Sequence, residues 1–223
     1  MKVWVAPSLL AADFARLADA ARAAEEGGAD LLHVDVMDGH FVPGLTIGPP
    51  VVAALRRATS LPLDVHLMIE RPEDSLAEYL AAGAGWISVH VEATRHLQRC
   101  LDAVRRGGAR AGAVLNPATP TAALAAAWPD LDYAVVMSVN PGRGGQAFIP
   151  HSIEKVRRLK AEALEAGCGI PLEVDGGVDA GNAGALIRAG AEILVAGTAI
   201  YGEEDVPAAI ARIRGAASEG VRV

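Results

Sequence analysis

Two short β-branched segments of the sequence each carry a histidine and an aspartate with one residue between them. The first, HVDVMD, holds His33 and Asp35, and the second, DVHLM, holds Asp64 and His66. Alternate side chains of a β-strand point to the same face, so each pair shares one face of its strand. Burying an unpaired charge is costly, so these aspartates need partners if that face is inside the protein. Where imidazole and carboxylate side chains converge, a divalent cation can neutralise the carboxylates and bind the imidazole nitrogens. Such N/O ligands suit zinc, iron or manganese.

Spacing alone leaves the ligands of such a metal site open. A lone histidine in an apolar strand is more often a hydrogen-bonded core residue, and Asp64 could lie deeper and serve as an ion-pair partner. His90 and Glu92 have the same spacing in WISVHVEA, and Glu173 and Asp175 have it in EVDGG. The pattern therefore narrows the ligand set without selecting within it.

These segments belong to a regular alternation of strands and helices. Four helical stretches, with apolar residues at three- and four-residue spacing, run into a Gly-Ala or Gly-Gly pair just before the next strand, as in EEGGAD and VRRGGAR. Eight such strands predict a parallel sheet that closes into a single-domain (β/α)₈ TIM barrel over residues 1–223, with a doubly wound open sheet as the alternative. The predicted strands span residues 3–8, 31–38, 61–68, 86–93, 110–116, 133–140, 170–177 and 192–197.

Polar residues and methionines gather near the carboxyl ends of the predicted strands. In a parallel barrel these ends form one rim, where active sites are built. The polar residues are Ser8, His33, Asp35, Asp64, His66, Asn116, Ser138, Asn140 and Asp175. Met37, Met68 and Met137 lie at the same ends and predict an apolar, water-poor lining around the reacting atoms.

Three glycine-bearing segments follow neighbouring strands near the end of the chain. NPGRGGQ has glycines at 142, 144 and 145, which let backbone N–H groups turn around an anion. The last two strands end in DGG (175–177) and AGT (196–198). Any one of them could be an ordinary turn, but loops after the last strands commonly grip phosphate in such barrels. Together they predict a phosphate site.

Composition argues against several functional classes. The net charge of −7 leaves no basic stripe for nucleic acid, and no apolar run approaches the length of a membrane span. A secretory leader is not recognisable, and Cys100 and Cys168 have no metal-like spacing. We therefore expect a cytoplasmic protein that acts on a small molecule, without a nucleic-acid or membrane partner.

Several segments, read together, resemble the ribulose-phosphate 3-epimerase family. They are, in order, APSLLAADF, HVDVMDGHFVPGLTIGPP, DVHLMIERPE, LNPATP, MSVNPGRGGQAF, EVDGGV and EILVAGTAIYG. The resemblance implies a ribulose-phosphate-binding (β/α)₈ barrel that interconverts D-ribulose 5-phosphate and D-xylulose 5-phosphate in the pentose phosphate pathway. It also implies one divalent cation, Zn, Fe, Mn or Co, and a homo-oligomer.

The resemblance further implies roles for individual residues. His33, Asp35, His66 and Asp175 resemble the family's metal ligands, Asp35 and Asp175 its acid/base pair, and Ser8, His66 and Asp175 its substrate contacts. The phosphate-side segments correspond to Gly142, Arg143, Gly144, Gly145, Gly176, Gly177, Gly197 and Thr198. Epimerisation beside a ketone removes a proton from one face and returns one to the other, which two opposed carboxyls can do through a metal-stabilised cis-enediolate.

Two positions depart from the family's pattern. Arg143 stands where the glycine-rich loop usually has Phe, so an apolar contact is lost and a cation is placed at the phosphate position, where it could tighten binding or could point into solvent. Gly44 stands where Asn is common, which could loosen the loop after the second strand. Three other functions compete with the pentose epimerase: an epimerase for a related ketose phosphate such as D-allulose 6-phosphate, a metal-dependent hydrolase, and a non-catalytic sugar-phosphate sensor. A hydrolase commonly has His-x-His where this chain has His-x-Asp, and a sensor would be expected to lose one of the opposed aspartates.

Overall fold

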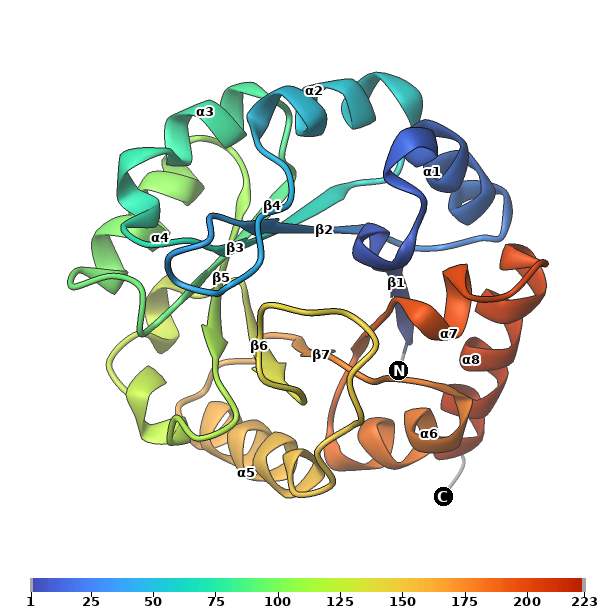
Figure 1. The fold of residues 1–223 in the computed structure, drawn as a ribbon. Helices are drawn as coiled ribbons and strands as arrows, with labels where there is room; N and C mark the ends of the chain where they lie inside the picture. Colours follow the sequence, from blue (N-terminus) through green and yellow to red (C-terminus); the bar gives the residue numbers. More distant parts are fainter. Residues whose placement is uncertain (1, 222–223) are drawn as a thin grey trace.

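Eight parallel strands form a barrel at the centre of the molecule, and helices surround it (Figure 1). The computed structural model describes residues 2–221. Neighbouring strands pair in the order β1-β8-β7-β6-β5-β4-β3-β2, so the open-sheet alternative is wrong. The strands are β1 (Trp4–Pro7), β2 (Leu32–Met37), β3 (Leu63–Met68), β4 (Trp86–His90), β5 (Arg110–Leu115), β6 (Tyr133–Met137), β7 (Leu172–Asp175) and β8 (Ile193–Ala196).

The helices lie outside the strands, and four of them end as the glycine pairs predict. After α1, α3, α4 and α6, the residues Gly28, Gly83, Gly108 and Gly190 have φ angles of 75°, 94°, 84° and 109°, which turn the chain into the next strand. The α-helices are α1 (Leu17–Glu26), α2 (Pro49–Ala58), α3 (Leu76–Ala81), α4 (Leu97–Arg106), α5 (Ser152–Glu165), α6 (Ala180–Ala189), α7 (Thr198–Tyr201) and α8 (Val206–Val221). Within residues 2–221, no helix combines the length and the hydrophobicity that crossing a bilayer requires.

The connection between β5 and β6 differs from the expected alternation. In place of an α-helix it contains two 3₁₀ turns, Thr121–Leu124 and Trp128–Asp130. Prolines at 117, 120 and 129 interrupt this connection, and proline removes a helical hydrogen bond and clashes with the preceding turn.

A short seam between β1 and β2 closes the ring. Ser8 forms a parallel bridge with His33, and the Asp30 amide donates to the Val5 carbonyl at 3.0 Å. The Asp30 carboxylate accepts hydrogen bonds from the Val5 amide at 3.0 Å and from Arg214 of α8 at 2.7 Å. One carboxylate thereby connects the first strand, the approach to the second and the last helix.

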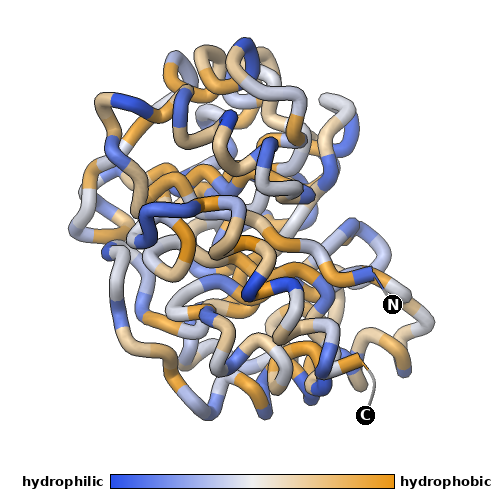
Figure 2. Tube along the Cα trace, turned by 90° about the vertical axis from the view of Figure 1, so that its right-hand side faces the viewer, coloured by the Kyte–Doolittle hydropathy of each residue, from blue (hydrophilic) through white to orange (hydrophobic). Residues whose placement is uncertain are grey.

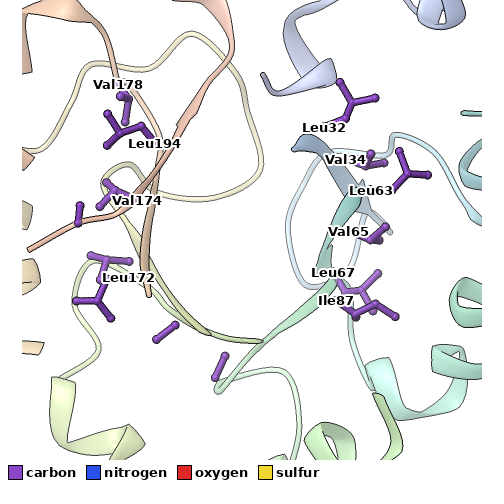
Figure 3. Packing of buried hydrophobic residues seen from close by; sticks show 14 of the residues in the cluster. Leu32, Val34, Leu63, Val65, Leu67, Ile87, Leu172, Val174, Val178 and Leu194 are labelled. Carbon is purple, nitrogen blue, oxygen red and sulfur yellow. The ribbon is translucent and has the colours of Figure 1, made fainter. Parts of the chain in front are cut away.

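The two faces of each strand belong to different layers. Outward side chains such as Leu32, Val65 and Val174 pack between the strands and the helices (Figure 3). Inward side chains, among them Trp86 and Tyr133, fill the amino-terminal part of the barrel with a second apolar cluster. Hydrophobic residues accordingly concentrate along the strands, while hydrophilic segments lie mainly at the periphery (Figure 2). The polar inward residues of β2, β3 and β7 are left at the carboxyl end.

Gly112 on β5 makes room for the ring of Tyr133 on the adjacent strand. A Cβ atom at Gly112 would lie 2.4 Å from Cζ of Tyr133, whose hydroxyl donates to Asp64 Oδ1 at 2.9 Å. We predict that Gly112→Ala lowers the free energy of unfolding by about 1–3 kcal/mol, because the added methyl must displace a packed ring. Urea denaturation followed by circular dichroism measures the change.

Gly215→Ala is the matched control for this substitution. Gly215 lies within α8, and no heavy atom lies within 4 Å of the position that its Cβ would take. Alanine is favoured over glycine in a helix by about 0.5–1 kcal/mol, so this variant should be more stable than the wild type. Equal stabilisation by both substitutions would contradict the tight packing at Gly112.

Candidate active site

Four side chains from β2, β3 and β7 converge inside the carboxyl end of the barrel. They are His33, Asp35, His66 and Asp175, and one ligand atom from each lies within 4.8 Å of all the others. Asp35 Oδ1 lies 3.4 Å from both His33 Nε2 and His66 Nδ1. Asp175 Oδ2 lies 3.8 Å from His33 Nε2 and 3.4 Å from His66 Nδ1. The two carboxylates therefore face the same two imidazole nitrogens.

These two nitrogens make the cluster suitable for a cation. His33 Nε2 and His66 Nδ1 are buried, and neither has a hydrogen-bond partner among the described residues. Leaving a buried polar atom unpaired is costly, so an unpaired atom at this position needs a physical reason. Two imidazole nitrogens and two carboxylate oxygens are a donor set that zinc, iron, manganese or cobalt accepts. The residues present thus fit one divalent cation.

Asp64 fixes His33 from the opposite side. His33 Nδ1 lies 2.6 Å from Asp64 Oδ2, both side chains are fully buried, and Asp64 Oδ1 accepts the Tyr133 hydroxyl. A proton on His33 Nδ1, donated to Asp64, leaves the lone pair of Nε2 free to face the cation position. His33, Asp64 and Glu173 form a second group at metal-ligand distances, but its imidazole nitrogen is already engaged by Asp64. The ion-pair role, left open by the sequence, is the one that the geometry favours for Asp64.

Tyr133 is a part of this arrangement that the sequence reasoning missed. Tyr133 is the first residue of β6, and its side chain points inward like that of Met137, four residues later. Strand periodicity was therefore the signal that could have placed Tyr133 inside the barrel. Burial raises the pKa of the Tyr133 phenol well above its usual range, and the nearby Asp64 carboxylate adds to the effect. Tyr133 therefore stays protonated and can donate its hydrogen bond to Asp64 over a wide pH range.

Opposite charges compensate one another within the cluster. Burial opposes protonation of both imidazoles, but the neighbouring carboxylates outweigh it and raise the pKa of His33 well above its usual range and that of His66 to a lesser extent. Burial likewise opposes ionisation of Asp35, yet His33 and His66 hold the pKa of that carboxyl far below its ordinary value. The ionised carboxylate of Asp35 is thus stabilised by positive charge on the imidazoles.

Ser8 orients Asp35 from the end of β1. Its hydroxyl donates to Asp35 Oδ2 at 2.6 Å and accepts from the Leu10 amide at 3.3 Å. This contact holds one oxygen of Asp35 and leaves the other facing the imidazoles. The structure also places Ser8 on the wall of the cavity, where the family resemblance implies a substrate contact.

A cavity of about 400 Å³ opens beside the cluster. Asp35 and Asp175 line it, whereas His33 and His66 are fully buried and do not reach its wall. The remaining site residues predicted from the sequence all line this cavity: Ser8, Met37, Met68, Met137, Gly142, Arg143, Gly144, Gly145, Gly176, Gly177, Gly197 and Thr198. The chain segments that follow β2 and β6 cross the mouth of the barrel in Figure 1.

The segment after β6 is held in shape by its own side chains. The side-chain amide of Gln146 donates to the backbone carbonyl oxygens of Asn140 at 2.6 Å and Arg143 at 2.9 Å. The Ser138 hydroxyl donates to the Gly176 carbonyl at 2.6 Å and ties this segment to the one after β7. These bonds fix the course of the glycine-rich backbone along the cavity.

Gly44 brings the segment after β2 against the same glycine-rich segment. A Cβ atom at Gly44 would lie 2.7 Å from Met37 Sδ and 2.8 Å from the Gly142 carbonyl oxygen. The Gly44 carbonyl accepts from the Gly39 amide at 2.8 Å, and the Thr46 hydroxyl donates to the Asp35 carbonyl at 2.7 Å. In place of the loosened loop expected from the sequence, glycine at this position permits a close contact between two hydrogen-bonded loops.

Comparison with known proteins adds an independent line of argument. Residues 4–201 match the model of the Ribulose-phosphate 3 epimerase family. The chain is 50% identical over 212 residues to ribulose-phosphate 3-epimerase of Bacillus subtilis (strain 168), an alignment that covers 95% of this chain and 98% of that protein. It is 46% identical over 211 residues to ribulose-phosphate 3-epimerase of Escherichia coli (strain K12), with 94% of each chain covered.

Solved structures with low sequence identity share the fold. KGPDC from Streptococcus mutans superposes with a TM-score of 0.74 at 13% identity, covering 98% of this chain and 99% of that one. 3-Hexulose-6-phosphate synthase superposes with a TM-score of 0.68 at 22% identity, covering 97% and 99% of the two chains. These likenesses concern the barrel alone.

We predict that the cluster binds one divalent cation and that His66→Gln weakens this binding. Zinc at about a hundred times its dissociation constant should add about 2.7 kcal/mol to the free energy of unfolding of the wild type, because it binds the folded state alone. His66→Gln should lose most of that gain. Urea denaturation of the chelator-treated protein, with and without zinc, measures both values.

His40→Gln is the control for the loss of an imidazole. His40 is exposed on the segment after β2 and lies outside the cluster. It should keep the full zinc-dependent gain. An equal gain in His66→Gln would contradict the assignment of His66 as a ligand.

Proposed function

Because the chain belongs to the ribulose-phosphate 3-epimerase family, we propose that it interconverts D-ribulose 5-phosphate and D-xylulose 5-phosphate by inverting carbon 3. One observation carries the mechanism: Asp35 and Asp175 both line the cavity, and their oxygens lie 3.4 Å from the same His66 nitrogen. Two carboxyls that share one small region can act on one carbon without a large movement of the substrate.

The positions of the two carboxyls in the barrel suit an inversion. Asp35 belongs to β2 and Asp175 to β7, and these strands are three steps apart around the ring through β1 and β8. They therefore approach the cavity from different sides. One carboxylate removes the proton from one face of carbon 3, and the other carboxyl, protonated, returns a proton to the opposite face.

Residues around this pair support the proton transfers. A divalent cation held by His33, Asp35, His66 and Asp175 would stabilise the negative charge that develops on the substrate oxygens. The Ser8 hydroxyl keeps Asp35 oriented through its bond to Oδ2. Met37, Met68 and Met137 line the cavity and exclude water from its wall, which strengthens electrostatic interactions at the reacting carbon.

The glycine-rich segments and Arg143 are proposed to bind the phosphate. Among the described residues that line the cavity, Arg143 is the only lysine or arginine. The acidic residues of the lining are Asp35, Asp175 and Asp179. A phosphate dianion that enters such a cavity needs compensating positive charge. Backbone N–H groups of the glycine-rich segments can supply part of it, and the Arg143 guanidinium can supply a full charge.

The proposal includes a cytoplasmic setting and a homo-oligomeric state. Cys100 and Cys168 are both free, as expected of a protein in a reducing compartment. The homo-oligomer is carried by the family resemblance, and sedimentation equilibrium would test it.

We predict that Asp35→Asn and Asp175→Asn each lower kcat by about 10²–10⁴-fold, the usual contribution of a positioned acid or base. A coupled assay with D-ribulose 5-phosphate measures turnover, and circular dichroism verifies folding. Asp102→Asn, on the outer helix α4, is the control and should retain wild-type turnover. Substantial turnover in both site variants would rule out the two-carboxylate mechanism, and faster turnover of D-allulose 6-phosphate would reassign the substrate.

We predict that Arg143→Phe raises KM for D-ribulose 5-phosphate and leaves kcat little changed. Salt screens an exposed charge, since the Debye length is about 8 Å at 0.15 M ionic strength. The wild-type KM should therefore rise more steeply with salt than that of Arg143→Phe, and Arg143→Lys should retain most of the salt dependence. KM values measured at low and high salt decide the matter, and the same salt dependence in wild type and Arg143→Phe would show that Arg143 does not engage the phosphate.

A further inference from the structure

His66 is connected, on the side away from Asp35 and Asp175, to polar groups that the proposed reaction does not use. His66 Nε2 and His90 Nε2 lie 2.9 Å apart, and both rings are fully buried. The ring planes differ by 22° and the ring centroids are 5.0 Å apart. Because the centroid separation is so much longer than the N–N distance and the planes are nearly parallel, the rings meet edge to edge through their nitrogens.

The connection continues from His90 to the rim of the barrel. His90 Nδ1 lies 3.4 Å from Glu92 Oε2, which is an ion-pair distance without hydrogen-bond geometry, and this nitrogen has no hydrogen-bond partner among the described residues. The other oxygen of Glu92 accepts from the backbone amide of Asn116 at 3.2 Å and from the Thr119 hydroxyl. Lys155 donates to the Asn116 carbonyl and so fixes the segment after β5 that holds Glu92. The side chain of Glu92 is 27% exposed, so the chain of contacts leads from the fully buried His66 to partly solvated groups.

The proton between the two imidazoles can take either of two arrangements. If His66 donates from Nε2, His90 accepts at Nε2 and carries its own proton on Nδ1, where it faces Glu92. If His90 donates instead, its bare Nδ1 faces the carboxylate of Glu92, and two acceptors oppose each other. With a cation between His66 Nδ1 and the two aspartates, the Glu92 carboxylate, which already accepts from the backbone amide of Asn116 and the Thr119 hydroxyl, favours the first arrangement. In that arrangement the lone pair of His66 Nδ1 faces Asp35 and Asp175.

We propose that His90 and Glu92 are positioning residues of the metal site, which hold His66 in the tautomer that ligates through Nδ1. This inference rests on the proposed metal site. It also accounts for a difference between the two imidazoles. Asp64 engages Nδ1 of His33 and leaves its Nε2 free, whereas His90 engages Nε2 of His66 and leaves its Nδ1 free. Partners of this kind fix the tautomer and orientation of a ligating histidine.

Glu92→Gln is the principal test, because it removes the charge and keeps the shape. Competition with a chromogenic chelator should show about 10- to 100-fold weaker zinc binding, the usual cost of losing such a partner. The unfolding midpoint of the metal-free variant should match that of the wild type, and the zinc-dependent rise of the midpoint should shrink. A merely structural role would lower the metal-free midpoint and leave zinc affinity unchanged.

Glu70→Gln is the matched control, since Glu70 is an exposed carboxylate just after β3 and outside this chain of contacts. It should bind zinc as the wild type does. A second pair of variants tests His90: Gln keeps a hydrogen-bond acceptor for His66 and Phe removes it, so zinc affinity should fall more in His90→Phe than in His90→Gln.

The outcomes separate this inference from the proposed function. Wild-type zinc affinity in both Glu92→Gln and His90→Phe would overturn the positioning role and leave the metal site intact. A wild-type protein that binds neither zinc nor cobalt would overturn the metal site itself, and the positioning role with it.

Discussion

The structure depends on how charge is neutralised inside the barrel. Three strands, β2, β3 and β7, direct carboxyl groups inward, where an unpaired ion is costly. Their inward residues are His33, Asp35, Asp64, His66, Glu173 and Asp175. Asp64 is hydrogen-bonded to His33 and Tyr133, and Asp35 is hydrogen-bonded to Ser8. The two imidazole nitrogens without partners face the same carboxylates, so pairing among the described residues is incomplete at the proposed cation position. Both oxygens of Glu173 also lack partners, and burial together with the nearby Asp64 raises the pKa of that carboxyl well above its usual range.

The apolar layer beneath this cluster takes part in the same arrangement. Tyr133 belongs to the apolar filling of the barrel, yet its hydroxyl reaches up to Asp64. The ring fits because Gly112 on the adjacent strand has no side chain. The orientation of His33 thus depends, through Asp64 and Tyr133, on a glycine of β5. Packing and electrostatics are coupled here, since a shift of the ring would weaken a bond to a buried carboxylate.

Sequence periodicity predicted the eight strands, their inward faces and the common rim, because each depends on alternation along single strands. Periodicity was unable to select the ligands, because Asp64, His66 and His90 all occupy inward positions. Pairing between strands separates them: His33 pairs with Asp64, and Asp35 pairs with His66. Asp64 therefore stands beside the ligand His33 and engages its Nδ1, whereas His66 stands beside Asp35. Register comes from pairing between strands, which the pattern of any one strand does not contain.

The distribution of charge in the cavity orients a substrate that has a phosphate at one end. The carboxylates of Asp35 and Asp175 lie beside the proposed cation position, and Arg143 lies on the glycine-rich segment after β6. Carboxylates repel a phosphate dianion, whereas a guanidinium and backbone N–H groups attract it. Gly44 and Gly142 let the two loops that cross the mouth approach closely, which keeps the segment that carries Arg143 near the cavity. Under the proposed function, a sugar phosphate would bind with its phosphate at these loops and its carbonyl end beside the two aspartates, which is the orientation that epimerisation requires.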